Sequence, residues 1–134
     1  GYGEKLTLIS FDLSFLPEGA HITSARLGLR QFNSGSGGTV SIHRTTVPWD
    51  EQQVSWNSFA EGYDSTRVWG SFIAQGKGEK TVDLTDLVRA WMEEGVANYG
   101  MTLKGDSTTI FDVFFASEIW VLEKRPWLEV CYTP

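Results

Sequence analysis

The sequence has 134 residues and a net charge of −6, with 41% hydrophobic and 21% charged residues. This is the size and composition of one globular domain, and the acidic balance disfavours a nucleic-acid-binding protein, which normally carries a basic excess. One cysteine and two histidines are too few for an internal disulfide or a Cys/His zinc cluster, and no apolar run approaches the ~20 residues of a membrane-spanning helix.

Apolar and polar residues alternate along much of the first third of the chain, as they do in half-buried β-strands. The alternation covers segments 6–13, 22–32 and 40–47. A Leu-Pro-Glu-Gly turn at 16–19 follows the first segment, and the Gly- and Ser-rich stretch 33–39 follows the second. The pattern therefore predicts three strands, joined by a turn and by a flexible loop.

The middle of the chain is less regular. Segment 48–60 has no clean period, and we interpret it as a structured loop with a short helical turn, pinned by Trp49 and Trp56. Segment 61–75 places aromatic residues in a polar stretch, which predicts an excursion followed by a strand. Gly-Lys-Gly at 76–78 is typical of a hairpin or a loop.

One segment has a helical pattern. The extended residues 80–84 lead into a predicted helix at 86–94, which Thr85 can cap at its N-terminus and Gly95 can terminate. Its apolar residues fall on one side: Leu87, Val88, Trp91 and Met92.

Further strands are expected at 99–104, 110–118 and 126–132, where Leu128, Val130 and Tyr132 share one face. About seven to nine short strands with one short helix are typical of an all-β, two-sheet β-sandwich of jelly-roll type. We expect residues 1–134 to form a single module of this kind, excised from a longer multidomain protein.

Several stretches carry a resemblance to a known family when they are taken in order. They are LISFDLSFLP at 8–17, ITSARLGL at 22–29, VSIHRTTVPWDEQQVSWN at 40–57, VDLTDLVRAWMEEGVANYGMTL at 82–103, and SE at 117–118 with RPWLEVCY at 125–132. The third stretch matches the family pattern at Trp49, Glu51, Val54, Trp56 and Asn57. The fourth matches it at Asp83, Thr85, Leu87, Val88, Trp91, Asn98, Tyr99 and Gly100. Together they resemble the bacterial DNRLRE domain, associated with carbohydrate-binding module family 96 and related in fold to the TGF-β propeptide and to archaeal disaggregatase-related repeats.

The sequence departs from that family at two places. Family members usually begin with a further strand ahead of an N-Y-G turn, which the opening Gly-Tyr-Gly echoes, so we expect one sheet edge to lack a strand. They also often place a basic residue before the F-D of the first motif, where this chain has Ser10. A ligand role at that position does not carry over.

The resemblance implies a non-catalytic module appended to secreted polysaccharide lyases, hydrolases or surface proteins, some of which bind acidic algal polysaccharide such as alginate. We therefore expect a secreted or cell-surface bacterial carbohydrate-binding module whose partners are a polysaccharide and an appended catalytic or surface domain, with neither nucleic acid nor a membrane span. The first alternative is a structural or adhesive domain without a glycan ligand. The second is a small lyase or hydrolase, which requires two facing carboxylates or a Tyr–His–Arg cluster in a deep cleft.

Six tryptophans are a large number for this length, and exposed rings can stack on the C–H faces of sugars. Three occupy inward positions of matched motifs and are assigned to the core: Trp49, Trp56 and Trp91. Three are less constrained: Trp69, Trp120 and Trp127. The predicted stacking residues are Tyr63, Trp69 and Trp120, and the alternative for each is partial burial as cover for the core.

Strand alternation also predicts a basic outer face. If Leu27, Leu29, Ile42, Met101 and Leu103 point inward, then the residues between them point outward: Arg26, Arg30, His43, Thr102 and Lys104. If their strands are neighbours in one sheet, these cations can bind the carboxylates or sulfates of an acidic polysaccharide. The alternative is that solvent-facing Arg and Lys serve solubility and edge protection.

The sequence shows no catalytic signature. It has no G-x-S-x-G elbow, its glycine-rich loops lack the G-K-[ST] ending of a phosphate loop, and Cys131 has no local motif. A structural Ca²⁺ on the loops is a further expectation, with five candidate ligands among which no spacing selects: Asp12, Asp83, Asp86, Asp106 and Asp112. The alternative for each is a solvated or capping carboxylate, which we favour for Asp83 at the helix start.

Overall fold

The computed structural model describes residues 6–31, 38–48, 62–75, 78–105 and 126–134. Its elements are β1 (Leu6–Ile9), β2 (His21–Gln31), β3 (Thr39–Arg44), β4 (Gly70–Ile73), β5 (Gly78–Asp83), α2 (Thr85–Glu93), β6 (Met101–Gly105) and β7 (Trp127–Thr133).

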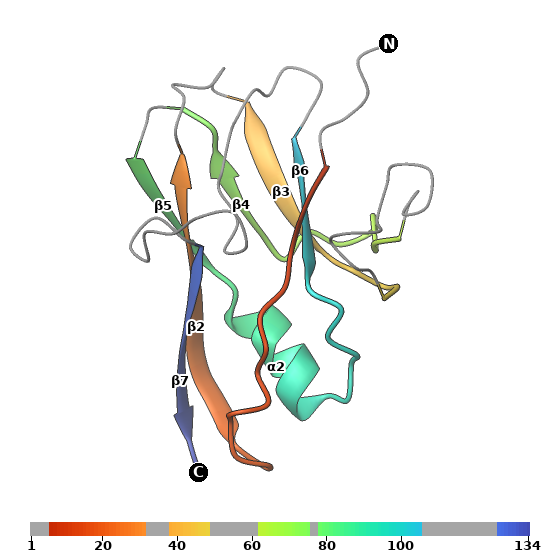
Figure 1. Cartoon of the computed structure of the whole chain (residues 1–134), viewed down its shortest axis with the longest axis vertical. Coiled ribbons are helices and arrows are strands. Elements are labelled where there is room, and N and C mark those ends of the chain that lie inside the picture. The colour runs from red at the N-terminus through yellow and green to blue at the C-terminus, as the bar shows by residue number, and fades with distance from the viewer. Residues whose placement is uncertain (1–5, 32–37, 49–61, 76–77, 106–125) are drawn as a thin grey trace.

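The strands form two antiparallel sheets that face each other (Figure 1). One has four strands in the order β1-β6-β3-β4, and the other has three in the order β5-β2-β7. Within the described residues, the predicted all-β, two-sheet sandwich with one short helix is therefore confirmed.

Strand β2 shows how the alternating sequence builds the core. Ala25, Leu27 and Leu29 are buried between the sheets, whereas Arg26 and Arg30 are exposed on the other side. Burying a leucine side chain stabilises a fold by about 1.5–3 kcal/mol, so the alternation fixes which side of the strand faces inward. The four-stranded sheet contributes further buried residues to the same cluster: Ile9, Val40, Ile42, Phe72, Met101 and Leu103.

Helix α2 lies between the two sheets near one end of the sandwich and contacts β2 (Figure 1). It buries its predicted apolar side, with Leu87, Val88, Ala90 and Trp91 in the core. The assignment of Trp91 to the core is confirmed, since only 7% of it is exposed. Within the described residues, no helix has the length and hydrophobicity needed to cross a membrane.

The start of α2 corrects one prediction. Thr85 is the first helical residue and not the N-cap, a position that Leu84 occupies without a side-chain hydrogen bond. Asp83 does the capping instead, because its Oδ1 accepts bonds from the backbone N–H and the hydroxyl of Thr85 at 2.9 and 2.6 Å. The Thr85 Oγ1 then accepts a bond from the backbone N–H of Ala25 at 3.0 Å and so ties the helix to β2. Gly95 ends the helix as predicted, at φ +73°.

Strand β1 is shorter than the predicted 6–13 because the chain turns after Ile9. Asp12 Oδ1 accepts the backbone N–H of Ser14, and Leu16 N–H bonds to Leu13 O at 3.1 Å. Strand β3 ends at Arg44 and not at 47. Segment 61–75 contains an isolated bridge at Tyr63 followed by β4, close to the predicted excursion and strand.

Some predictions concern residues outside the described ranges. These are the core roles of Trp49 and Trp56, the stacking role of Trp120, the strand at 110–118, and the Ca²⁺ ligands Asp106 and Asp112.

Candidate functional site

Residues 62–69 form a loop that is fastened along β3 at both ends; we call it the 62–69 loop. At its start, Thr45 bridges Tyr63, and Asp64 N–H bonds to Arg44 O at 2.9 Å. At its end, Trp69 N–H bonds to Ile42 O at 2.9 Å and leads into β4. The loop is therefore held in one place against the four-stranded sheet.

The side chain of His43 on β3 holds the middle of the 62–69 loop against the sheet through hydrogen bonds. Its Nδ1 lies 3.0 Å from the carbonyl oxygens of both Asp64 and Arg67, and its Nε2 lies 2.8 Å from Ser41 Oγ. Two carbonyl acceptors at Nδ1 require that this nitrogen carries the proton. The expected outward exposure of His43 is wrong: the side chain points away from the core, as alternation predicts, but only 4% of it is exposed because the loop covers it. Thr102, also expected to face solvent, is fully buried and bonds to Thr45 across the same outer side.

Asp64 stabilises the turn inside the loop. Its Oδ1 accepts hydrogen bonds from both the hydroxyl and the backbone N–H of Thr66. These bonds hold the pKa of the Asp64 carboxyl below its usual value of 3.8, with smaller contributions from the nearby Arg44 and His43. The turn is therefore most stable when Asp64 is ionised.

The aromatic residues of this region are not open stacking surfaces. Tyr63 is only 8% exposed, and its ring lies 5.3 Å from that of His43. Trp69 packs against the core and carries the Arg67 guanidinium 3.5 Å from its ring centroid. Both rings therefore fit the alternative of partial burial as cover for the core, and each has a cation beside it; their stacking on sugars stays a prediction.

Cations gather on these rings. Arg67 lies on Trp69, Lys104 Nζ is 5.9 Å from the ring centroid of Tyr63, and Arg44 adjoins Asp64. We call Arg67 and Lys104 the β3 basic patch; Arg44 is not part of it, because alternation in β3 places it on the side of Ile42. These two cations lie on aromatic rings over the four-stranded sheet of a chain whose net charge is −6.

A guanidinium that lies flat on an indole keeps its N–H groups in the plane of the guanidinium, at right angles to the stacking direction. Arg67 can therefore bind a carboxylate through two parallel hydrogen bonds while it stays on Trp69. Arg67 was missed at the sequence level. The signal for Arg67 was its place two residues before Trp69 in the same polar stretch.

Arg26 and Arg30 lie elsewhere. Both belong to β2 in the three-stranded sheet, whereas His43 and Lys104 belong to β3 and β6 in the other sheet. The prediction of one shared basic face is therefore wrong, since outer faces of the two sheets point in opposite directions. Arg26 is also paired with Glu129 at 2.9 Å.

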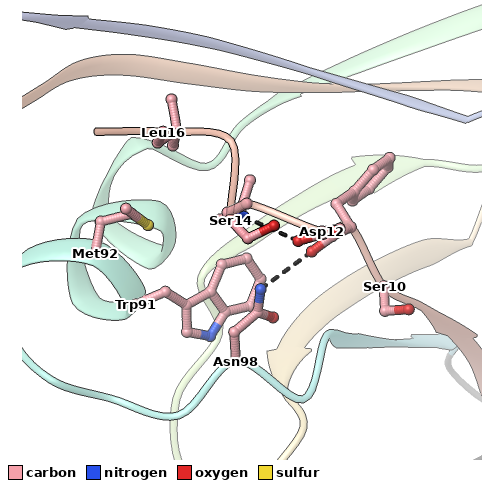
Figure 2. A pocket seen from close by; sticks show the side chains of 9 residues that line it. Ser10, Asp12, Ser14, Leu16, Trp91, Met92 and Asn98 are labelled. Carbon is pink, nitrogen blue, oxygen red and sulfur yellow. Dashed lines mark hydrogen bonds between the residues drawn. The ribbon is translucent and has the colours of Figure 1, made fainter. Parts of the chain in front are cut away.

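A shallow pocket of about 500 Å³ lies beside α2, under the turn that follows β1 (Figure 2). Its described lining residues are Ser10, Phe11, Asp12, Leu13, Ser14, Leu16, Trp91, Met92 and Asn98. Asn98 Nδ2 donates to Phe11 O at 3.1 Å, and hydrogen bonds from Ser14 lower the pKa of Asp12. Asp12 is the one charged group in this lining, which makes the pocket unsuited to an acidic sugar.

The sequence matches the family model described as Carbohydrate-binding module family 96 over residues 2–123. The chain belongs to carbohydrate-binding module family 96. The predicted family resemblance is thereby confirmed. A search of curated proteins finds no match to this sequence.

Carbohydrate-binding module families are in general non-catalytic and commonly extracellular. The rings of Tyr63 and His43 do come together, as in the cluster that a lyase would need, but only the backbone carbonyl of Arg67 contacts His43. However, both ring nitrogens of His43 have hydrogen-bond partners, and His43 and Tyr63 are both buried. A buried imidazole engaged on both sides is poorly placed to exchange a proton with a polysaccharide.

The part of the chain that the structure describes contains no group of three His, Cys, Asp or Glu side chains that could hold a metal ion. Asp12 and Asp83 accept hydrogen bonds from Ser14 and Thr85, and Asp86 lies 4.0 Å from Arg89 on the same helix.

Proposed function

We propose that this module binds an acidic polysaccharide, such as alginate, through the β3 basic patch. It would do so without chemistry, as the binding part of a secreted bacterial polysaccharide-degrading protein. Membership of carbohydrate-binding module family 96 supports a glycan ligand. The observation that carries the choice of an acidic glycan is the position of Arg67 and Lys104 against the rings of Trp69 and Tyr63 in an otherwise acidic chain.

The two cations of the patch lie against aromatic rings in the protein without a ligand. Trp69 holds the Arg67 guanidinium from below, and His43 fixes the backbone carbonyl of Arg67 itself. Immobilising long side chains on binding costs about 0.5–1.5 kcal/mol each, so a guanidinium that is already stacked loses less. Arg67 would bind a uronate carboxylate with two hydrogen bonds, and Lys104 would act as a nearby point charge.

Affinity gels containing alginate, pectin, carrageenan, xylan or β-glucan test this proposal, run with calcium and with chelator. We expect retardation by the uronate or sulfated gels. We also expect Arg67→Gln and Lys104→Gln each to weaken it by about tenfold, because each removes one charge-assisted contact worth about 1.5 kcal/mol.

The matched control is Arg26→Gln, an exposed cation on the other sheet whose charge Glu129 already offsets. This variant should bind the acidic gels as the unaltered chain does. Equal loss in Arg26→Gln and Arg67→Gln would overturn the assignment to the patch. A folded chain that no gel retards would favour the structural or adhesive alternative.

A further inference from the structure

Gly28 lies in the middle of β2, on the outer face of the three-stranded sheet, where a side chain would be expected. The indole of Trp127, its register partner on β7, occupies this space. A Cβ built on Gly28 would lie 1.9 Å from Trp127 Cε2, which no real contact allows. Glycine is therefore required here so that the ring can approach the strand.

The distances also give the orientation of the ring. The same Cβ position is 2.3 Å from both Cζ2 and Nε1, the two neighbours of Cε2 outside the shared ring bond. If this Cβ position lay in the ring plane, outside the ring, it would be about as close to Cζ2 and Nε1 as to Cε2. A Cβ position directly above Cε2, along the normal to the ring, is farther from Cζ2 and Nε1 than from Cε2, and this is what the distances show. The indole therefore lies flat across the strand, and its opposite face is directed away from the sandwich.

This ring differs from Trp69 in what covers it. A guanidinium sits on Trp69, whereas among the described cations none stacks on Trp127, which remains partly exposed. A flat indole backed by a strand is rigid, and a rigid aromatic plane is what a sugar ring needs for stacking through its C–H groups.

Polar side chains surround the ring on the same face. On one side, Arg26 donates to Glu129 at 2.9 Å, with about half of each side chain exposed. The register places Thr81 across from Gly28, and places Glu79 across from Arg30. All of these groups are exposed and offer donors and acceptors to hydroxyl groups near the plane.

The charges of this face point to the class of ligand. Among the described residues of this face, the guanidiniums of Arg26 and Arg30 are outnumbered by three carboxylates: Glu79, Asp83 and Glu129. A face with excess negative charge repels uronates and sulfated sugars. Paired Arg and Glu side chains beside an indole suit uncharged hydroxyl-bearing rings.

We propose that Trp127 on Gly28 forms a second glycan-binding site, which takes a neutral pyranose residue of a polysaccharide chain. The Trp127 indole stacks on the sugar, and Arg26, Glu129 and Thr81 bond to its hydroxyls. The site is on the opposite sheet from the β3 basic patch, so the two are independent in position and in ligand charge.

Affinity gels containing xylan, glucomannan or mixed-linkage β-glucan test the site. We expect at least one to retard the unaltered chain and Trp127→Ala to lose at least tenfold in affinity for it. Gly28→Ala should lose a similar amount, because the added Cβ pushes the ring off the strand. The control is Tyr132→Ala, an exposed aromatic on the same strand but on its other side. Retardation of Trp127→Ala by every neutral gel to the same extent as the unaltered chain would overturn the proposal.

A measurement on the unaltered chain avoids any effect of these variants on folding. Titration with xylohexaose, cellohexaose and mannohexaose, followed by amide NMR shifts, should move the signals of residues 26–30 and 127–131. Shifts confined to other strands, or no shift with any of the three, would refute the site. Alginate binding at the β3 basic patch is a separate readout that Trp127→Ala should leave unchanged, so the two proposals fail independently.

Discussion

Replacing His43 by alanine removes the hydrogen bonds by which this side chain, acting as a pin, holds the 62–69 loop to β3. The substitution deletes two hydrogen bonds: one between Nε2 and Ser41 Oγ, and one from the Nδ1 N–H that the carbonyls of Asp64 and Arg67 share. At about 1 kcal/mol each, their loss lowers the free energy of unfolding by about 2 kcal/mol. Water can reach the carbonyls of the largely exposed loop, so we expect no large further cost for leaving them without His43.

The chain offers a matched control in its other histidine. His21 also makes a short contact, to Glu93 at 2.6 Å, but its side chain is 62% exposed. An exposed side-chain contact of this kind contributes at most about 1 kcal/mol, so His21→Ala should cost less than half as much as His43→Ala. Urea denaturation of both variants at neutral pH measures the difference.

The same variant should weaken binding to alginate, although His43 is too buried to contact it. The loss follows because Arg67 is no longer fixed above Trp69, and affinity gels at a temperature where the variant is folded will detect it. Equal unfolding free energies for the two histidine variants would refute the role of His43 as a pin. Unchanged alginate affinity in folded His43→Ala would refute the link between the pin and the patch.

Three further predictions concern the scaffold. Thr85→Val should cost about 1–3 kcal/mol of unfolding free energy, because the buried Ala25 N–H loses its acceptor; Thr81→Val, at an exposed position, should stay within about 0.5 kcal/mol. Gly95→Ala should lower the thermal midpoint, because φ +73° costs a residue with a Cβ about 1–2 kcal/mol; an unchanged midpoint would contradict this. The pKa of Asp83 is lowered by bonds from Thr85, so its contribution is full above the usual value of 3.8 and is lost as pH falls through the lower folded value. Urea denaturation across that range should therefore show stability falling with acid, less steeply in Asp83→Asn, and parallel curves would contradict the assignment.

Much of the scaffold could be predicted from the sequence because it depends on local periodicity. The alternation in β2 separates buried Leu27 and Leu29 from exposed Arg26 and Arg30, and the helical spacing places Trp91 in the core. Periods of two and of 3.6 residues decide which side of an element faces the core, and hydrophobic burial enforces that side.

The candidate site was harder to predict because it depends on contacts between distant segments. Alternation predicted that the His43 side chain points away from the core, but it did not predict that the 62–69 loop covers this side chain. It likewise gave the outward side of Arg30 and Lys104 without showing that their strands belong to different sheets. The close approach of Trp127 to Gly28 joins opposite ends of the chain, and the glycine inside a strand pattern was the one local sign of it.

The location of acidic polysaccharide binding is the central claim, and amide NMR shifts during titration with alginate oligosaccharides test it most directly. The account predicts that the largest shifts fall in residues 62–69 and 101–105, around Arg67 and Lys104, with little change in β2 and β7. Shifts concentrated on β2 and β7, or around Asp12 in the pocket beside α2, would contradict it.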